Sequence, residues 1–413
     1  MGGEGAPETG DVLAPEDPES LAAAVREAAA GHRALEVRGA GSKRGFGRPV
    51  EAEAVVTTAR LTGIDLYEPE ELVMTARAGT PLAEVAARLA ENRQELAFEP
   101  ADYGWITGGR EGAQTIGGVF ACNLSGPRRF KAGAARDHLL GLRCVTGRGE
   151  LVRSGGRVMK NVTGYDLCKL LCGSFGTLAV LTEVTFKVLP AAEAVGTLVI
   201  WGVEEAGLLG LLRRATGTPF DVSGAAVLTA LAAGRSTVAE IWRPGAPLAL
   251  LRVEGPQPSV DYRLARLEQA LARPDLRFMR IEDASSRRLW REIRDLRLLP
   301  RERVLWRMSI PPRAASELAS WFAELTPERL YDWAGGLVWL AAREVWADAA
   351  ATMRRALRGR GGHLTLVRAP EEMRRSTAVF EPEPPPLFAL TRRVKAAFDP
   401  LGILNPGRMY AEL

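Results

Sequence analysis

The sequence predicts an α+β protein with a glycine-rich N-terminal region and a second region in which strands and helices alternate. Residues 115–189 carry a dense run of glycines that punctuates short apolar strands. After Pro190 this texture ends, and strand-like runs alternate with amphipathic helices. The chain has 413 residues, which exceeds the usual size of one domain and agrees with this division.

The composition is that of an ordinary soluble globular protein. Apolar residues make up 46% of the chain and charged residues 25%, which is ample for a packed core. The 54 basic residues are offset by 50 acidic ones and spread along the chain, so no basic arm indicates nucleic-acid binding. We find no run of 18 apolar residues and no signal-peptide pattern, and therefore expect no membrane span and a cytoplasmic location.

Cysteines and histidines restrict the possible chemistry. The four cysteines lie between Cys122 and Cys172 without a CxxC pair, which favours buried thiols over a disulfide framework, an iron–sulfur site or a metal site. His32 ends a helix and is expected to be solvated, whereas His138 is expected to pack or to contact a backbone carbonyl. His363, at the start of a strand, is the remaining candidate for a catalytic base.

No Ser-His-Asp set and no HExxH motif appears, so the sequence does not favour a hydrolase or a metalloenzyme.

The first elements follow from caps and periodicity. Residues 1–14 are expected to be disordered. Asp17 and Pro18 begin a capped helix, and the strand ALEV leads into the turn RGAGSKRG at 38–45. Three strands and a helix that opens at Pro81 are predicted next: 53–58, 61–67, 72–78 and 81–92.

Later elements complete the domain plan. From Gly117 the pattern predicts strand, turn and strand, then a helix near 164–173 and a long strand that ends at Pro190. Further strands are predicted at 195–201, 248–254 and 337–341, and helices at 205–215, 258–272, 314–325 and 346–358. The prolines of 381–386 predict a stiff extended linker before a last helix. The predicted units are a disordered N-terminus, a first domain, a second domain, and a C-terminal helix with its tail: 1–14, 15–190, 191–385 and 386–413.

Three glycine-rich loops could admit a large anionic ligand. The turn 38–45 has the glycine spacing of an anion nest with Ser42 and Lys43 available to a phosphate, although it fits neither a P-loop nor a Rossmann fingerprint. Residues 117–118 and 173–177 leave backbone amides unobstructed by side chains. Each loop alone is also compatible with an ordinary turn or a strand bulge. Three of them in one domain favour a bound dinucleotide.

The arginine pairs 128–129 and 287–288 could bind a substrate carboxylate through bidentate hydrogen bonds. Arginine is abundant along the whole chain, however. We therefore expect both pairs to lie on solvated faces.

Several segments together resemble flavoproteins of the vanillyl-alcohol-oxidase type, and within them the FAD-binding E subunits of bacterial glycolate oxidases. The resemblance covers residues 15–190 and the tail at 398–410. It is carried by RGAGSK, LTGIDLYEPEELVMTARAGTPLAEV, LAFEPADYG, TIGGVFACNLSGPRRFKAGAARDHLLG, VMKNVTGYD, GSFGTLAVLTEVTFKVLP and FDPLGILNPGRMY. The combination of NLSGPRR with VMKNVTGYD points to the E subunit within the wider family.

The resemblance implies a two-subdomain FAD-binding domain of this type, followed by an α+β cap domain over the flavin ring. It implies that the pyrophosphate of FAD is bound by Arg38, Gly39, Ala40, Gly41, Ser42 and Lys43 from one side and by Thr115, Gly117 and Gly118 from the other. Further contacts are implied for Pro100 at the adenine end, for Asn123, Ser125 and Gly126 near the flavin, for the backbone of Gly176, Thr177 and Val180, and for Asn405 in the tail.

Two departures from the family pattern qualify this expectation. Members that attach flavin covalently carry a histidine at the position of Ser42, so FAD is expected to be noncovalent here. Members that oxidise 2-hydroxy acids alone carry a histidine-rich cap motif that supplies a base, and residues 191–385 contain nothing like it. No catalytic residue is therefore assigned.

The function implied by the resemblance is that of an FAD-dependent oxidoreductase acting on CH–OH groups. The chain would oxidise glycolate, a small 2-hydroxy acid, to glyoxylate within a complex that also contains a second flavin subunit and an iron–sulfur subunit. It would reach the inner membrane face only through these partners. Two alternatives stay open: a non-catalytic FAD-containing scaffold or electron-transfer subunit, and a free-standing D-2-hydroxyacid dehydrogenase that uses His363 as base.

Overall fold

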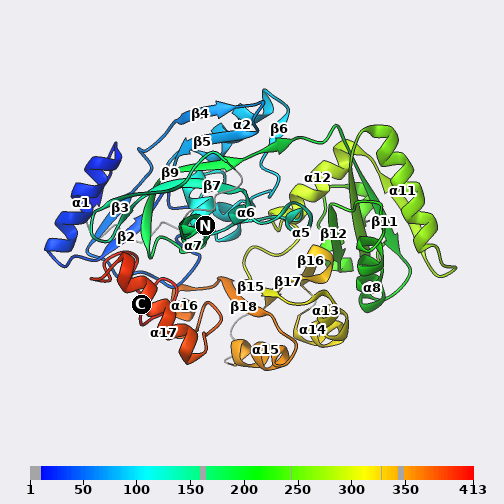
Figure 1. Cartoon of the computed structure of the whole chain (residues 1–413). Coiled ribbons are helices and arrows are strands. Elements are labelled where there is room, and N and C mark those ends of the chain that lie inside the picture. The colour runs from blue at the N-terminus through cyan, green and yellow to red at the C-terminus, as the bar shows by residue number, and fades with distance from the viewer. Residues whose placement is uncertain (1–10, 159–163, 243, 327, 343–347) are drawn as a thin grey trace.

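The computed structural model describes residues 11–158, 164–242, 244–326, 328–342 and 348–413. Residues 1–10 of the predicted disordered terminus, and residues 159–163 of the segment VMKNVTGYD, lie outside these ranges. Figure 1 shows an N-terminal region, residues 11–190, beside a cap formed by residues 191–384, with the C-terminal segment returning to the N-terminal region. The boundary at residue 190 stays a prediction.

The first subdomain packs one helix on a small parallel sheet. Helix α1 (Pro18–Ala30) begins where predicted, because the Asp17 carboxylate accepts a hydrogen bond from the Ser20 amide at 2.6 Å in a capping box. The sheet has the order β1 (Asp11–Leu13), β3 (Ala54–Thr57) and β2 (Leu35–Arg38). Residues 11–13, expected to be disordered, thus form an edge strand that pairs with β3.

The second subdomain is a five-stranded antiparallel sheet with short helices around it. The strand order is β4 (Ile64–Glu68), β5 (Val73–Arg77), β9 (Ala179–Lys187), β7 (Leu139–Thr146) and β8 (Leu151–Gly155). The helices are α2 (Leu82–Ala90), α3 (Tyr103–Ile106), α4 (Ile116–Ala121), α5 (Arg129–Ala132), α6 (Ala135–His138) and α7 (Leu167–Leu171).

Gly117 and Gly118 lie in helix α4, which corrects the strand predicted from Gly117 onward. Thr115 is the N-cap, and its Oγ1 accepts a hydrogen bond from the Gly118 amide at 3.3 Å. A Cβ atom on Gly117 would lie 2.6 Å from the Cβ atom of Ala78, so this glycine lets the helix pack against the end of β5. The capping threonine and this close packing together favour a helix over the strand.

The cap is built on an eight-stranded antiparallel sheet that the chain enters after β10 (Leu189–Pro190), which pairs with β6 (Gln94–Glu95). The strand order is β14 (Arg277–Ile281), β11 (Ala194–Trp201), β13 (Leu248–Gly255), β12 (Gly224–Leu228), β16 (Arg329–Asp332), β17 (Leu337–Ala342), β15 (Val304–Ser309) and β18 (His363–Arg368).

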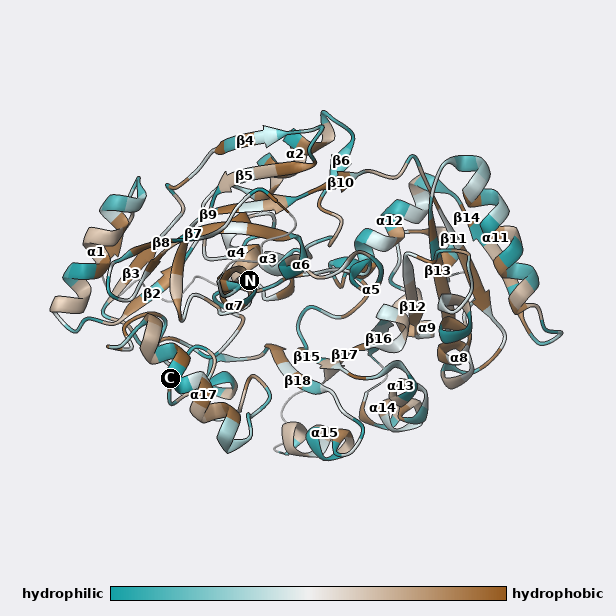
Figure 2. Ribbon diagram, in the orientation of Figure 1, coloured by the Kyte–Doolittle hydropathy of each residue, from teal (hydrophilic) through white to brown (hydrophobic). Residues whose placement is uncertain are grey.

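Successive side chains along the cap strands point to opposite faces of the sheet, and each face contributes to a different hydrophobic core. Leu251 and Val253 of β13 face an outer layer of helices, whereas Leu250 belongs to a core continuous with the N-terminal region. The outer helices are α8 (Glu205–Thr216), α11 (Gln257–Leu271), α13 (Pro312–Glu317), α14 (Ala319–Leu325) and α15 (Ala349–Leu357). The inner core includes residues of α9 (Ala230–Ala233), α10 (Ala239–Trp242) and α12 (Asp283–Arg294). Figure 2 shows largely brown strands beside a helix α11 that alternates teal and brown.

The cap differs from the prediction in one helix and in four additional strands. The helix predicted at 314–325 is two helices, α13 and α14, which meet at Leu318. The strands β12, β14, β15 and β16 were not predicted. No described helix has the length and apolar character needed to cross a bilayer.

The C-terminal segment returns to the N-terminal region. After α16 (Glu371–Ser376), helix α17 (Pro385–Phe398) begins within the predicted proline linker, because prolines suit the first turn of a helix. Lys395 Nζ donates hydrogen bonds to the Thr177 carbonyl at 2.7 Å and to the Leu404 carbonyl at 2.9 Å, and pairs with buried Asp399. This buried pair fixes the tail beside β2 and the loop before β9.

Candidate functional site

The predicted pyrophosphate residues surround one narrow space, which we call the glycine-lined cavity, of about 90 Å³. It lies between the turn after β2, the start of α4 and the loop before β9. Twelve of the predicted residues line it: Arg38, Gly39, Ala40, Gly41, Ser42, Lys43, Thr115, Gly117, Gly118, Gly176, Val180 and Asn405.

Lys43 places a buried positive charge on this cavity. Its exposed fraction is 9%, and Nζ donates a hydrogen bond to the Ser42 hydroxyl at 3.2 Å. Among the described residues, no carboxylate lies within 4 Å of this nitrogen. Burial lowers the pKa of Lys43 to about 8, although Cys122 and Asp102 oppose the shift. The ammonium is therefore held in a position where an anionic ligand would stabilise it.

Arg408 supplies a second such charge and was not predicted. Its guanidinium donates hydrogen bonds to the carbonyls of Lys43 at 2.6 Å, Arg48 at 3.3 Å and Arg44 at 3.4 Å, and its exposed fraction is 8%. Burial lowers its pKa to about 10. Buried charges are usually paired, so two cations without carboxylate partners on a glycine-lined cavity suit a diphosphate. The residues present fit the phosphate portion of a dinucleotide.

Two of the cavity glycines have specific roles. Gly41 lies at φ 76°, a left-handed conformation that favours glycine in the turn after β2. A Cβ atom on Gly39 would lie 2.5 Å from Thr115 Oγ1, so its missing side chain lets the turn approach the N-cap of α4. The turn and the helix can thus face each other across a gap narrow enough to be filled by phosphate groups.

Asn405 closes the cavity from the C-terminal tail. Its side-chain oxygen accepts a hydrogen bond from the Val37 amide at 2.7 Å, and its Nδ2 donates to the Phe175 carbonyl at 2.8 Å. A Cβ atom on Gly176 would lie 2.9 Å from this Nδ2. The predicted return of Asn405 to the N-terminal region is thus seen as direct contacts with β2 and the loop 173–177.

A second space, the central cavity, lies between the N-terminal region and the cap. Its volume is about 670 Å³, and it shares the lining residues Cys122 and Phe175 with the glycine-lined cavity. The predicted flavin-side residues Asn123, Ser125 and Gly126 line it. From the cap it receives Arg307, Asp332, Trp339, His363 and Thr365. The two cavities are therefore neighbours, and the one under the cap is the larger.

Two predicted residues lie outside both cavities. Pro100 lines a third space, the outer cleft, of about 1110 Å³, which runs between α2 and the inner side of α12. Thr177 is buried and donates its hydroxyl hydrogen to the Ser174 carbonyl at 2.7 Å, while its own carbonyl accepts from Lys395. Thr177 therefore shapes the loop before β9.

Two of the three histidines, His32 and His138, have the surroundings that the sequence predicts. His32 is exposed beyond the end of α1, and His138 is buried with its Nε2 2.9 Å from the Ala132 carbonyl. His363 lines the central cavity. Desolvation lowers the pKa of His363, and the charges of Arg307 and Arg129 lower it further. The charge of Glu381 opposes this shift, and the His363 residue is itself exposed.

Asp332 is a second titratable group on the central cavity. It ends β16, is buried, and accepts a hydrogen bond from the Trp333 amide at 2.7 Å. Burial raises the pKa of Asp332 to about 7. Sequence patterns did not indicate this residue, because its burial depends on the pairing of β16 inside the sheet.

The predicted solvated faces are correct for one arginine pair and wrong for the other. Arg288 is exposed and Arg287 is partly exposed with its guanidinium bonded to Asp283 at 2.9 Å. Arg128 lies in the outer cleft and Arg129 on the central cavity. Arg128 and Arg129 are covered because the cap folds over the segment NLSGPRR, which contains them.

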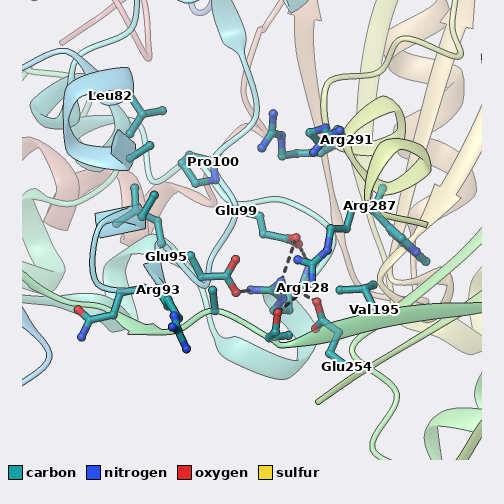
Figure 3. A pocket seen from close by; sticks show the side chains of 18 of the residues that line it. Leu82, Arg93, Glu95, Glu99, Pro100, Arg128, Val195, Glu254, Arg287 and Arg291 are labelled. Carbon is teal, nitrogen blue, oxygen red and sulfur yellow. Dashed lines mark hydrogen bonds and ion pairs between the residues drawn. The ribbon is translucent and has the colours of Figure 1, made fainter. Parts of the chain in front are cut away.

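A buried ion network crosses from the N-terminal region to the cap at the outer cleft. Figure 3 shows Arg128 among Glu95, Glu99 and Glu254. Arg252 of β13 donates hydrogen bonds to both carboxylate oxygens of Glu99 at 2.9 and 3.0 Å. The network therefore joins the loop before α3 to strand β13 of the cap.

Acid is expected to weaken this network. Burial alone would raise the pKa of Glu99, but Arg252 and Arg128 outweigh it and lower the pKa to about 2 from 4.5. A carboxyl with a depressed folded-state pKa stabilises the fold fully above its unfolded pKa, and this stabilisation is lost as pH falls from about 4.5 towards 2. Urea unfolding at pH 6, 4 and 3 should show that the free energy of unfolding falls more steeply with decreasing pH in the wild type than in Glu99→Gln. An equal pH dependence in the two proteins would contradict a depressed pKa for Glu99.

Family models match two parts of the chain. Residues 11–155 match the model described as FAD binding domain, and residues 373–409 match that of the FAD linked oxidases, C-terminal domain. The second match contains Asn405 and Arg408, both of which line the glycine-lined cavity. FAD is therefore the dinucleotide that this chain binds.

Solved structures show the same fold. The p-cresol methylhydroxylase with substrate bound superposes with a TM-score of 0.69 at 14% identity, covering 97% of this chain and 88% of that one. The 4-ethylphenol oxidase from Gulosibacter chungangensis has a TM-score of 0.68 at 14% identity, covering 97% and 89%. The predicted fold class, a two-subdomain FAD-binding domain followed by an α+β cap, is confirmed.

Curated relatives identify the family. Glycolate oxidase subunit GlcE of Escherichia coli is 35% identical over 96% of this chain and 98% of its own length. The D-lactate dehydrogenase of Archaeoglobus fulgidus is 32% identical over 46% of this chain and 41% of its own length. Glycolate oxidase subunit GlcD of Bacillus subtilis is 33% identical over 36% and 30%. The chain therefore belongs to the glycolate oxidase E-subunit family of FAD-dependent oxidoreductases.

Proposed function

We propose that this chain is the FAD-binding subunit of a glycolate oxidase complex that oxidises glycolate to glyoxylate. The full-length likeness to a glycolate oxidase subunit of Escherichia coli supports the substrate. The structural observation that carries the proposal is the glycine-lined cavity, where Lys43 and Arg408 are buried without carboxylates and which shares Cys122 and Phe175 with the central cavity. When bound, FAD supplies the acceptor for the hydride that leaves the hydroxyl-bearing carbon.

In this proposal the chain holds FAD with the residues of the two cavities. The turn Arg38–Lys43, together with Thr115, Gly117, Gly118 and Arg408, surrounds the diphosphate. Gly176, Val180 and Asn405 line the same cavity, and Asn123, Ser125 and Gly126 face the flavin from the central cavity. Pro100 and Thr177 line neither of these two cavities, and their proposed contacts with FAD rest on the family resemblance.

We further propose that FAD is held noncovalently. Ser42 stands where covalent members of the wider family carry a histidine, and its hydroxyl accepts a hydrogen bond from Lys43. A serine hydroxyl in this environment offers no activated nucleophile. Electrostatic contacts from Lys43 and Arg408 then account for retention of the cofactor.

The proposed partners are a second flavin subunit and an iron–sulfur subunit. The word subunit in the names of the relatives from Escherichia coli and Bacillus subtilis supports an assembly of several chains. The cap lacks a histidine cluster, which agrees with a division of the work among subunits. Contact with the inner membrane face would come through these partners.

The test begins with the full-length chain purified alone and with its partners. We expect an oxidised flavin spectrum and release of the flavin into the supernatant after acid precipitation. Anaerobic glycolate should leave the flavin of the isolated chain oxidised and bleach that of the assembled complex. A chain that shows no flavin band after refolding with excess FAD would contradict the proposal.

A second candidate function is a free-standing dehydrogenase for D-2-hydroxy acids. The observation that favours it is His363, which lines the central cavity and whose pKa is lowered by burial and by the charges of Arg307 and Arg129, a shift that favours the form able to accept a proton. In the same experiment, bleaching of the isolated chain by D-lactate or glycolate would favour this candidate over the complex.

A further inference from the structure

The central cavity contains two arginines that the FAD-binding residues do not explain. Arg129 opens helix α5 in the N-terminal region, and Arg307 lies in strand β15 of the cap. In the described part of the chain, neither guanidinium donates a hydrogen bond or has a carboxylate within 4 Å. Burial lowers the pKa of both groups, and the charge of Arg307 lowers that of Arg129 further. Two buried cations on one cavity favour an anionic ligand there.

Both guanidiniums lie over one aromatic ring. The Cζ atom of Arg129 is 4.6 Å from the ring centroid of Trp333, and that of Arg307 is 5.2 Å from it. Such contacts with a ring face stabilise the cations but leave their N–H groups unused. The donors of both arginines therefore remain available to a ligand in the cavity that they line.

The ring itself is held in place by an unusual turn. Trp333, Ala334 and Gly335 lie at φ 51°, 56° and 93°, between strands β16 and β17. Trp333 Nε1 donates a hydrogen bond to the Gly126 carbonyl at 3.0 Å, which joins this cap turn to the N-terminal region. Consecutive left-handed residues other than glycine are costly and often occur at functional sites. The turn places the ring beside arginines from two separate parts of the chain.

We propose that Arg129 and Arg307 bind the carboxylate group of a small 2-hydroxycarboxylate in the central cavity. This inference rests on the proposed function and names the substrate-binding residues of that flavin site. A guanidinium presents a planar fork of donors that matches a carboxylate. Tyr103, Trp339 and Phe380 supply apolar surface to the same cavity.

The test uses oxalate, a carboxylate that flavin cannot oxidise by hydride transfer, and glycolamide, the neutral analogue of glycolate. Calorimetric titration of the full-length FAD-loaded chain should detect oxalate and no glycolamide. Arg129→Met and Arg307→Met, which keep an apolar side chain over Trp333, should each weaken oxalate binding at least tenfold. Arg280→Met, at a surface arginine paired with Glu268, is the matched control and should leave binding unchanged. Flavin absorbance should be the same in all four proteins.

The outcomes separate this inference from the proposed function. A wild-type chain that carries flavin but binds no oxalate, or methionine variants that bind it normally, would overturn the assignment while FAD binding stands. A chain without flavin counts against the proposed function, and its oxalate titration still reports on the arginines. Should Arg307→Met fail to fold, Arg307→Lys retains the charge without the fork, and unchanged oxalate affinity in that variant overturns a bidentate role.

Discussion

Gly118→Glu is expected to abolish FAD binding while the chain stays folded. A Cβ atom at this position would lie 3.4 Å from Lys43 Nζ, so the added carboxylate reaches the ammonium and takes the place of the diphosphate. The helix accepts the change, because the added Cβ atom would meet only side-chain atoms, Thr115 Oγ1 at 3.3 Å and Lys43, and glutamate forms helix more readily than glycine. We expect FAD affinity to fall at least 100-fold, measured by titration of the apoprotein with FAD.

The matched control for this prediction is Gly210→Glu. Gly210 also lies in a helix, α8, and no atom lies within 4 Å of the added Cβ position. This variant should bind FAD as the wild type does. Thermal unfolding of both apoproteins separates loss of cofactor from loss of fold. Retention of FAD by a folded Gly118→Glu variant would show that the diphosphate does not occupy the glycine-lined cavity.

Local sequence signals predicted much of the N-terminal region. Asp17 followed by Pro18 gave the start of α1, and Pro81 gave the start of α2, because capping and proline geometry act within a few residues. Strands β3 and β5 also lie where short apolar runs predicted them. Helix α4 was missed, since its two glycines disfavour a helix and only the contact of Gly117 with Ala78 explains them.

The cap was less predictable because its strands are set by long-range pairing. Strand β12 is buried along its whole length, so it shows no alternation of polar and apolar residues. Strand β16 is buried too and begins with Arg329, whose guanidinium pairs with Glu205 from a distant helix. A charge that is neutralised only in the folded chain gives no local signal of burial.

The candidate site likewise contains residues that local sequence predicts and residues whose burial depends on tertiary structure. The glycines of the turn 38–45 could be predicted as site residues, because glycine indicates a tight backbone conformation from the local sequence alone. Arg408 and Arg307 were missed because arginine is common here and its burial depends on tertiary structure. Strand VLWRMS did carry one usable signal: Trp306 and Met308 face the outer core, so Arg307 between them must face the inner side.

Glu99→Gln is expected to cost about 3 kcal/mol of unfolding free energy, because removing one partner of a buried ion pair leaves the other uncompensated. The Arg252 side chain is 3% exposed and loses a bidentate contact, while Arg128 loses one of its three carboxylates. Glutamine suits the test because Glu99 lies at φ 47°, where glycine would relieve backbone strain and confuse the result. Urea unfolding at pH 7 measures the change.

The control for this second prediction is Glu268→Gln, which removes a surface partner of Arg280. These side chains are 37% and 42% exposed, so the change should stay within about 0.5 kcal/mol. The double variant Glu99→Gln/Arg252→Met should lose less stability than the two single changes together, because no arginine is left without its carboxylate. If the stability losses of Glu99→Gln and Arg252→Met add up in the double variant, the Glu99–Arg252 pair contributes no coupling between the N-terminal region and the cap. The position of Arg307 over the central cavity would then depend on the apolar core and on contacts such as the Trp333 hydrogen bond to the Gly126 carbonyl, and not on the Glu99–Arg252 pair of the outer cleft.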